Sequence, residues 1–157
     1  GGTGNTDGSI TGTSTNNNAA SGKVGEYLEA EVVIGDAVGL TSVTDTNIVS
    51  LSLTAGDWDV WGEVIFHSNA ATVITNLRAW ISTVSATAPG LPNKGANILV
   101  QATPAGTLVA GSSSQQFPVG QRRISLASTT TVYLGARSNF STNTMAAYGG
   151  LYARRVR

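Results

Sequence analysis

The stretch GDWDVWGEVIFH, residues 56–67, gathers the residue types that could do chemistry: three carboxylates, two tryptophans and the only histidine of the chain. Two kinds of catalysis would use them, hydrolysis by a serine that histidine activates and glycoside cleavage by paired carboxylates. No G-x-S-x-G motif accompanies His67. Asp57 and Asp59 lie too close in sequence to flank a sugar unless the chain bends between them. The stretch therefore predicts a protein that is not an enzyme.

Metal and nucleic-acid chemistry are also poorly supported. Asp45, Asp57 and Asp59 could offer calcium its preferred oxygen ligands, but their spacing matches no dense acidic loop. The chain has no cysteine, which excludes disulfides and thiolate metal sites. The basic pair Arg122 and Arg123 has no interleaved aromatic residues on which bases would stack. We expect no metal, no cofactor and no nucleic-acid partner.

The element that would position these side chains is a β-strand, in which successive residues point to opposite sides. One side of residues 58–66 is then a core face, made by Trp58, Val60, Val64 and Phe66. The other side carries Asp59, Trp61, Glu63 and Ile65. This mixture of one large aromatic ring and two acids indicates a surface that contacts a binding partner.

The rest of the chain shows the same two-residue period and no convincing helical one. Strands are expected in residues 26–35, 47–53, 58–66, 72–86, 97–103, 107–111, 121–128, 130–138 and 145–157. Residues 47–66 are expected to form a hairpin that turns at Ala55, Gly56 and Asp57, and residues 86–97 a loop. The prediction is an all-β fold: an antiparallel β-sandwich or jelly roll of TNF-like type, with eight to ten strands and little helix.

Composition divides the chain into two parts. Residues 1–22 are rich in Gly, Thr and Asn, which predicts a flexible linker or the end of a fibrous shaft. Residues 23–157 are long enough for one sandwich domain. Charged residues make up only 11% of the chain, against about 25% in ordinary globular proteins. No apolar run is long enough to span a bilayer, so no membrane insertion is expected.

Charge is segregated along the sequence. Residues 1–63 hold nine acids and one base, a net charge of −8, whereas residues 64–157 hold eight bases and no acid. Early strands that lie beside late strands, within one chain or between chains, would neutralise both halves.

Trp61 and Trp80 both fall on the side of their strands that faces away from the predicted core. Large aromatic residues are seldom left to solvent, so we expect another subunit to cover them. The predicted interface residues are Trp61, Trp80, Asp59, Glu63, Arg78, Arg137 and Arg154, with the acids near the late arginines. The alternatives are a sandwich that buries both sheet faces, or a register shifted by one residue, which would exchange the two faces.

Four segments together resemble the C-terminal domains of bacteriophage tail-fibre and related virion proteins: SLSLTAGDWDVWGEVIF, TTTVYLGARSNF, AAYGGLYARRVR and the lead-in DGSITGTSTNNN. The resemblance covers residues 22–157 loosely. It implies a homotrimeric β-sandwich head in the virion that binds a bacterial surface glycan or protein and joins other virion proteins through its N-terminal segment. It transfers no catalytic or binding residue.

Receptor contacts are expected on polar loops, because binding residues often lie on loops that a rigid scaffold positions. The candidate loops are residues 67–72, 87–97 and 138–144. Within them the candidate residues are His67, Asn69, Asn93, Lys94, Asn139, Phe140 and Asn143. Two other functions remain open: a purely structural virion part, such as a capsid decoration, and a carbohydrate-active enzyme whose site is split between subunits.

Overall fold

The computed structural model describes residues 14–92, 97–101 and 113–157. In these residues the chain forms nine strands and one short 3-10 turn, η1 (Ile34–Asp36). The strands are β1 (Tyr27–Val32), β2 (Val38–Gly39), β3 (Thr46–Leu53), β4 (Gly56–Ser68), β5 (Val73–Ser82), β6 (Asn97–Gln101), β7 (Ser113–Leu126), β8 (Thr130–Ser141) and β9 (Met145–Arg155). The prediction of an all-β fold with little helix is confirmed. The strand predicted at residues 107–111 lies outside the described residues.

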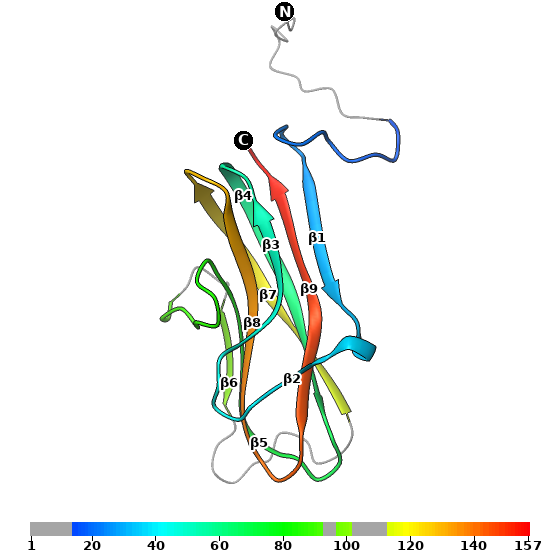
Figure 1. Cartoon of the computed structure of the whole chain (residues 1–157), viewed down its shortest axis with the longest axis vertical. Coiled ribbons are helices and arrows are strands. Elements are labelled where there is room, and N and C mark those ends of the chain that lie inside the picture. Colours follow the sequence, from blue (N-terminus) through cyan, green and yellow to red (C-terminus); the bar gives the residue numbers. More distant parts are fainter. Residues whose placement is uncertain (1–13, 93–96, 102–112) are drawn as a thin grey trace, which may run out of the picture.

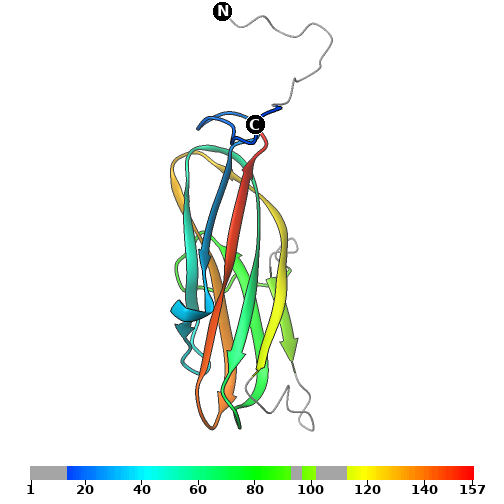
Figure 2. The same ribbon diagram turned by 90° about the vertical axis from the view of Figure 1, so that its right-hand side faces the viewer.

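The strands form two antiparallel sheets that pack face to face (Figures 1 and 2). The five-stranded sheet has the order β1-β9-β4-β7, with β2 also paired to β9. The four-stranded sheet has the order β3-β8-β5-β6. Residues far apart in sequence therefore become neighbours, as β1 and β9 show.

The core between the sheets is built from the alternating residues that the sequence predicts. Trp58, Val60 and Val64 of β4 are completely buried and Phe66 is 2% exposed. They pack in one cluster with residues of the opposite sheet, among them Leu77, Ala79 and Ile81 of β5. Removing such side chains from water stabilises the fold by about 25 cal/mol for each Å² of apolar surface buried. The predicted core face of residues 58–66 is confirmed.

The predicted hairpin at residues 47–66 is wrong. β3 pairs with β8 in the four-stranded sheet, whereas β4 pairs with β7 and β9 in the five-stranded sheet. The residues between β3 and β4 therefore carry the chain from one sheet to the other. Two strands that lie in different sheets show the same sequence pattern as a hairpin. Each alternates apolar and polar residues because one of its faces packs on the shared core, and turn-forming residues connect them.

The sandwich has two distinct ends (Figure 1). At one, which we call the exit end, β1 begins beside the last residues of β9, with Tyr27 in register with Arg154. At the other, the loop end, β4 finishes beside the start of β9, with Ser68 opposite Met145. β9 has 11 residues, so the two ends are about 35 Å apart at the rise of an extended strand.

The segregated charges meet within the chain. The four ion pairs found among the described residues each join an early acid to a late arginine. They are Glu26–Arg155, Asp45–Arg137, Asp57–Arg123 and Asp57–Arg157. The early and late strands neutralise one another because the topology places β1 and β4 beside β9 and β7, and β3 beside β8.

Candidate functional site: the loop end and the outer sheet faces

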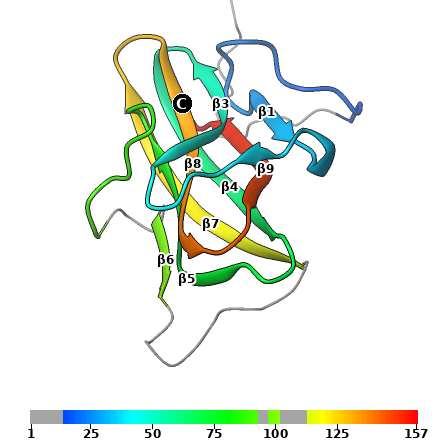
Figure 3. The same cartoon turned by 60° about the horizontal axis from the view of Figure 1, so that its bottom comes forward.

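A pocket of about 350 Å³ opens at the loop end. Figure 3 turns this end of the sandwich toward the viewer. Three strand ends and two loops contribute the pocket lining: Gly39, His67, Asn69, Thr144, Met145 and Ala146. Two of the three predicted receptor loops therefore meet here. Gly39 and Ala146 lie opposite each other on β2 and β9, and their small size leaves space between the larger residues.

Hydrogen bonds between neutral groups fix the two loops against each other. The buried Thr72 donates its hydroxyl to the Thr144 carbonyl at 3.0 Å, and the Asn143 amide donates to the Ala70 carbonyl at 2.7 Å. Asn143 has a left-handed φ of 67°, which asparagine tolerates better than most residues. The side chain of Asn143 thus holds the turn that precedes the pocket residue Thr144.

His67 offers no catalytic arrangement in the described part of the chain. Its Nδ1 lies 3.0 Å from the hydroxyl of Ser114, which also accepts a long hydrogen bond of 3.5 Å from Tyr148. No carboxylate is recorded on the ring, and no group of three potential metal ligands occurs among the described residues. His67 is a polar rim residue of the pocket.

The remaining candidate loop residues lie elsewhere. Asn139 and Phe140 belong to β8 rather than to a loop, and Phe140 packs against the hydrophobic core. The ring of Phe140 is therefore partly buried against the core instead of lying free in a loop. Asn93 and Lys94 lie outside the described residues.

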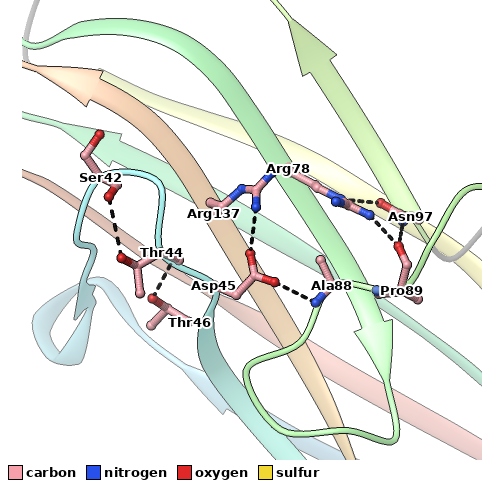
Figure 4. Close-up of polar contacts among 9 residues, drawn as sticks. All are labelled: Ser42, Thr44, Asp45, Thr46, Arg78, Ala88, Pro89, Asn97 and Arg137. Carbon is pink, nitrogen blue, oxygen red and sulfur yellow. Dashed lines mark hydrogen bonds and ion pairs between the residues drawn. The ribbon is translucent and has the colours of Figure 1, made fainter.

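The described part of the third loop, residues 87–92, is not at the loop end. It belongs to a segment that crosses the outer face of the four-stranded sheet (Figure 4). Asp45 holds this segment on one side, accepting a hydrogen bond of 2.7 Å from the Ala88 amide. On the other side, Pro89 accepts hydrogen bonds from Arg78 and Asn97.

Trp80 is buried by its own chain, so its assignment to a subunit interface is wrong. It faces away from the core, as predicted, and yet is 0% exposed. Its ring lies over Gly135 of β8, where a Cβ atom would be only 2.3 Å from the indole. Arg78, which shares this outer face, lies 5.8 Å from the centre of the Trp80 ring. Ala88 and Pro89, which Asp45, Arg78 and Asn97 bind, lie on the same face.

Trp61 has a different environment, on the outer face of the five-stranded sheet. It is partly exposed and lies between two tyrosines, with ring centroids 6.1 Å from Tyr27 and 6.1 Å from Tyr152. We call Tyr27, Trp61 and Tyr152 the aromatic cluster. Glu29 and Glu31 accept hydrogen bonds from the two tyrosine hydroxyls.

Of the three late arginines named in the prediction, Arg154 is the one that lies beside a predicted acid, and Arg123 lies on the other side of the same acid, in register with Asp59 across β4 and β7. Arg154 lies in register with Asp59 across β9 and β4. Arg137 instead pairs with Asp45, and Arg78 bonds to Pro89 and Asn97, both on the four-stranded sheet. Glu63 accepts its hydrogen bond from Gln116. The sequence could not show that Arg78 and Arg137 belong to the other sheet.

Sequence reasoning missed Tyr27 and Tyr152 as members of an aromatic surface. Each has the strand phase of an outward residue, which was a usable signal. Their approach to Trp61 depends on the register of β1 and β4 with β9, and this register joins residues more than 120 positions apart.

The exit end is held by charges. Arg155 and Glu26 form an ion pair at 2.9 Å, with side chains only 5% and 6% exposed. Arg155 also lies 4.2 Å above the ring of Trp58. Burial alone would raise the pKa of Glu26, but hydrogen bonds from the Gly22 amide and from Arg155 outweigh it, so the pKa is lowered. Hydrogen bonds from Arg123 lower the pKa of Asp57.

No protein-family model and no curated protein sequence matches this chain. Solved structures of infectious bursal disease virus align with much of this chain. A structure of the Gx strain aligns with a TM-score of 0.48 and 14% identity, covering 83% of this chain and 32% of that one. The VP2 subviral particle aligns with a TM-score of 0.45 and 14% identity, over 83% and 33% of the two chains. The chain thus spans about a third of the length of these neighbours.

Among the described residues, none of the helical structure is long and apolar enough to cross a membrane.

Proposed function

We propose that this chain is a non-enzymatic β-sandwich module of a virion surface, held to the particle at its exit end. The observation that carries the proposal is the polarity of the sandwich. The chain enters β1 and leaves β9 at one end, and the pocket lies at the opposite end. Any flanking chain would join the domain at the exit end and leave the loop end projecting. The fibre-like lead-in of residues 7–18 supports the same arrangement.

Electron microscopy of particles labelled with antibody fragments tests this assignment. A fragment that recognises the loop end should decorate the particle surface, and one that recognises residues 127–129, at the exit end, should bind the isolated chain but not the particle. Absence of the protein from purified particles would contradict the proposal.

Self-association as a closed trimer is part of the proposal. With charged residues at only 11% of the chain, little repulsion keeps copies apart. The apolar side chains of Val33 and Ile34, just beyond the edge strand β1, are 59% and 55% exposed. Sedimentation equilibrium should give three times the mass of the chain, and a stable monomer at micromolar concentration would contradict it.

A second candidate function is attachment to a host surface, favoured by the pocket between the two polar loops. The purified chain should compete with particles for adsorption to host cells. Asn69→Trp, which fills the pocket rim, should abolish this competition, whereas Ser128→Trp at the exit end should not. If both variants compete equally well, the pocket does not mediate attachment, and the structural role is the function that remains. Release of oligosaccharides from host glycan would instead indicate an enzyme whose site is shared between subunits.

A further inference from the structure

The aromatic cluster and the loop-end pocket lie on one face of the same strands. Trp61 and His67 both point to the outer face of β4, and six residues separate them, a span of about 20 Å. The residues in register on β9 are Tyr152 opposite Trp61, Tyr148 opposite Ile65, and Ala146 opposite His67. We call this surface, from Trp61 and Tyr152 to the pocket, the outer strip.

The floor of the outer strip is flat because of Gly150. A Cβ atom at Gly150 would lie 2.2 Å from the hydroxyl oxygen of Tyr152, so the tyrosine ring occupies the place of the missing side chain. The Tyr152 hydroxyl then donates a hydrogen bond of 2.9 Å to Glu31 on β1. The ring of Tyr152 is thus held down along β9 instead of standing out from the sheet.

Carboxylates flank this floor on both sides. Glu31 of β1 and Glu63 of β4 are both in register with Gly150 of β9. Burial raises the pKa of Tyr152, and the hydrogen bond to Glu31 and the negative charges of Glu31 and Glu63 raise it further. The phenol therefore stays protonated as a donor. The remaining lone pairs of the two carboxylates are free to accept hydrogen bonds from a ligand.

A flat aromatic floor between hydrogen-bond acceptors has the chemistry that recognises a sugar ring. The electron-rich face of an aromatic ring attracts the C–H edges of a pyranose, and carboxylates accept hydrogen bonds from its hydroxyls. We infer that the outer strip binds an extended glycan of neutral or amino sugars, with sugar rings stacked on Trp61 and Tyr152 and the chain running along β4 and β9 to the pocket beside His67.

The charge of the strip selects this ligand over two others. Glu29, Glu31 and Glu63 repel sugars that carry carboxylates, so acidic polysaccharides are disfavoured. In a two-fold contact with a second copy of the chain, the same acids would face one another. The outer face of the four-stranded sheet offers no free basic partner at Arg78 and Arg137, which Pro89, Asn97 and Asp45 already engage. The proposed glycan contact involves residues of one chain alone, so it does not depend on the proposed role of the chain in a virion.

A glycan array tests the inference with the full chain. The array carries cello-oligosaccharides, chito-oligosaccharides, their de-N-acetylated forms and oligogalacturonates. We expect binding to longer neutral or amino-sugar chains and none to the oligogalacturonates. Isothermal titration with the best ligand should show Trp61→Ala and Tyr152→Ala weakened by about tenfold or more, the loss expected from removing one stacked ring. Tyr133→Ala removes a partly exposed tyrosine from the other sheet and should bind normally.

The variant Glu31→Gln separates the two sugar classes. It should weaken binding of amino sugars, which carry positive charge, more than binding of neutral sugars. Circular dichroism confirms that each variant is folded. The inference is overturned if no array glycan binds, if oligogalacturonates bind best, or if folded Trp61→Ala binds as well as the parent chain. It is also overturned if Trp61→Ala dissociates the oligomer with glycan binding unchanged, because a second copy then covers the strip.

Discussion

The exit end and the loop end of the sandwich are held together by different forces. At the exit end, Glu26 and Arg155 form a buried ion pair, and Asp57 is bound by two arginines. At the loop end, the contacts are hydrogen bonds between neutral groups, such as that from Thr72 to Thr144. Losing one partner of a buried ion pair leaves a charge without compensation, whereas water can replace a neutral partner at the surface. The exit end therefore tolerates little change and the loop end tolerates much, which suits a module that is fixed at one end and varies at the other.

The largest expected effect is that of Arg155→Ala. It removes the partner of Glu26 and the cation above Trp58. The free energy of unfolding, measured by urea denaturation, should fall by about 3–5 kcal/mol. The control is Arg123→Ala, whose side chain is 56% exposed and whose partner Asp57 keeps Arg157. It should cost no more than about 1 kcal/mol. Equal losses in the two variants would show that burial of the pair is not decisive.

Acid should weaken the exit end before the loop end. The pKa of Glu26 and that of Asp57 are lowered in the folded protein. Their contribution to stability is complete above the pKa of the unfolded chain and is lost as the pH falls toward the folded value. We expect a constant melting temperature near neutral pH and a steep fall below about pH 4.

Two variants identify the group responsible for this fall. Glu26→Gln should lower the melting temperature at neutral pH and make it less dependent on acid. Asp36→Asn, at an exposed position in η1, should keep the steep fall. An unchanged acid profile in Glu26→Gln would assign the effect to other carboxylates.

A smaller effect is expected for Asn143→Ala at the loop end. It removes the bond to Ala70 and places alanine at a φ of 67°. The free energy of unfolding should fall by about 1–2 kcal/mol. Asn143→Gly removes the same bond without backbone strain and should lose less. If both variants lose the same amount, backbone strain contributes nothing at this turn.

The smallest effect is expected for His67→Ala. In the described part of the chain, its ring bonds to Ser114 at an exposed position. The free energy of unfolding, measured by urea denaturation, should therefore change by no more than about 0.5 kcal/mol. A larger loss would show that the ring makes contacts beyond Ser114. Oligosaccharide release from host glycan that a folded His67→Ala variant loses would revive an enzymatic role.

The sequence by itself determined the strands and their faces. Alternation placed Trp58, Val60 and Val64 in the core, because a strand that covers a core must bury every second residue. It also placed Trp61 and Trp80 on outer faces, and the structure agrees for both strands. Local patterns carry this information because the period of a strand depends only on its own backbone.

Only the tertiary structure decided what each outer face meets. Trp80 is buried within its own chain, whereas Trp61 stays partly open beside Tyr27 and Tyr152. The turn between β3 and β4 likewise became a crossover between sheets instead of a hairpin. These outcomes depend on strand order and on a register that joins residues up to 127 positions apart, as Tyr27 and Arg154 show. The free energy of such pairings comes from the assembled core, so no local stretch of the sequence records it.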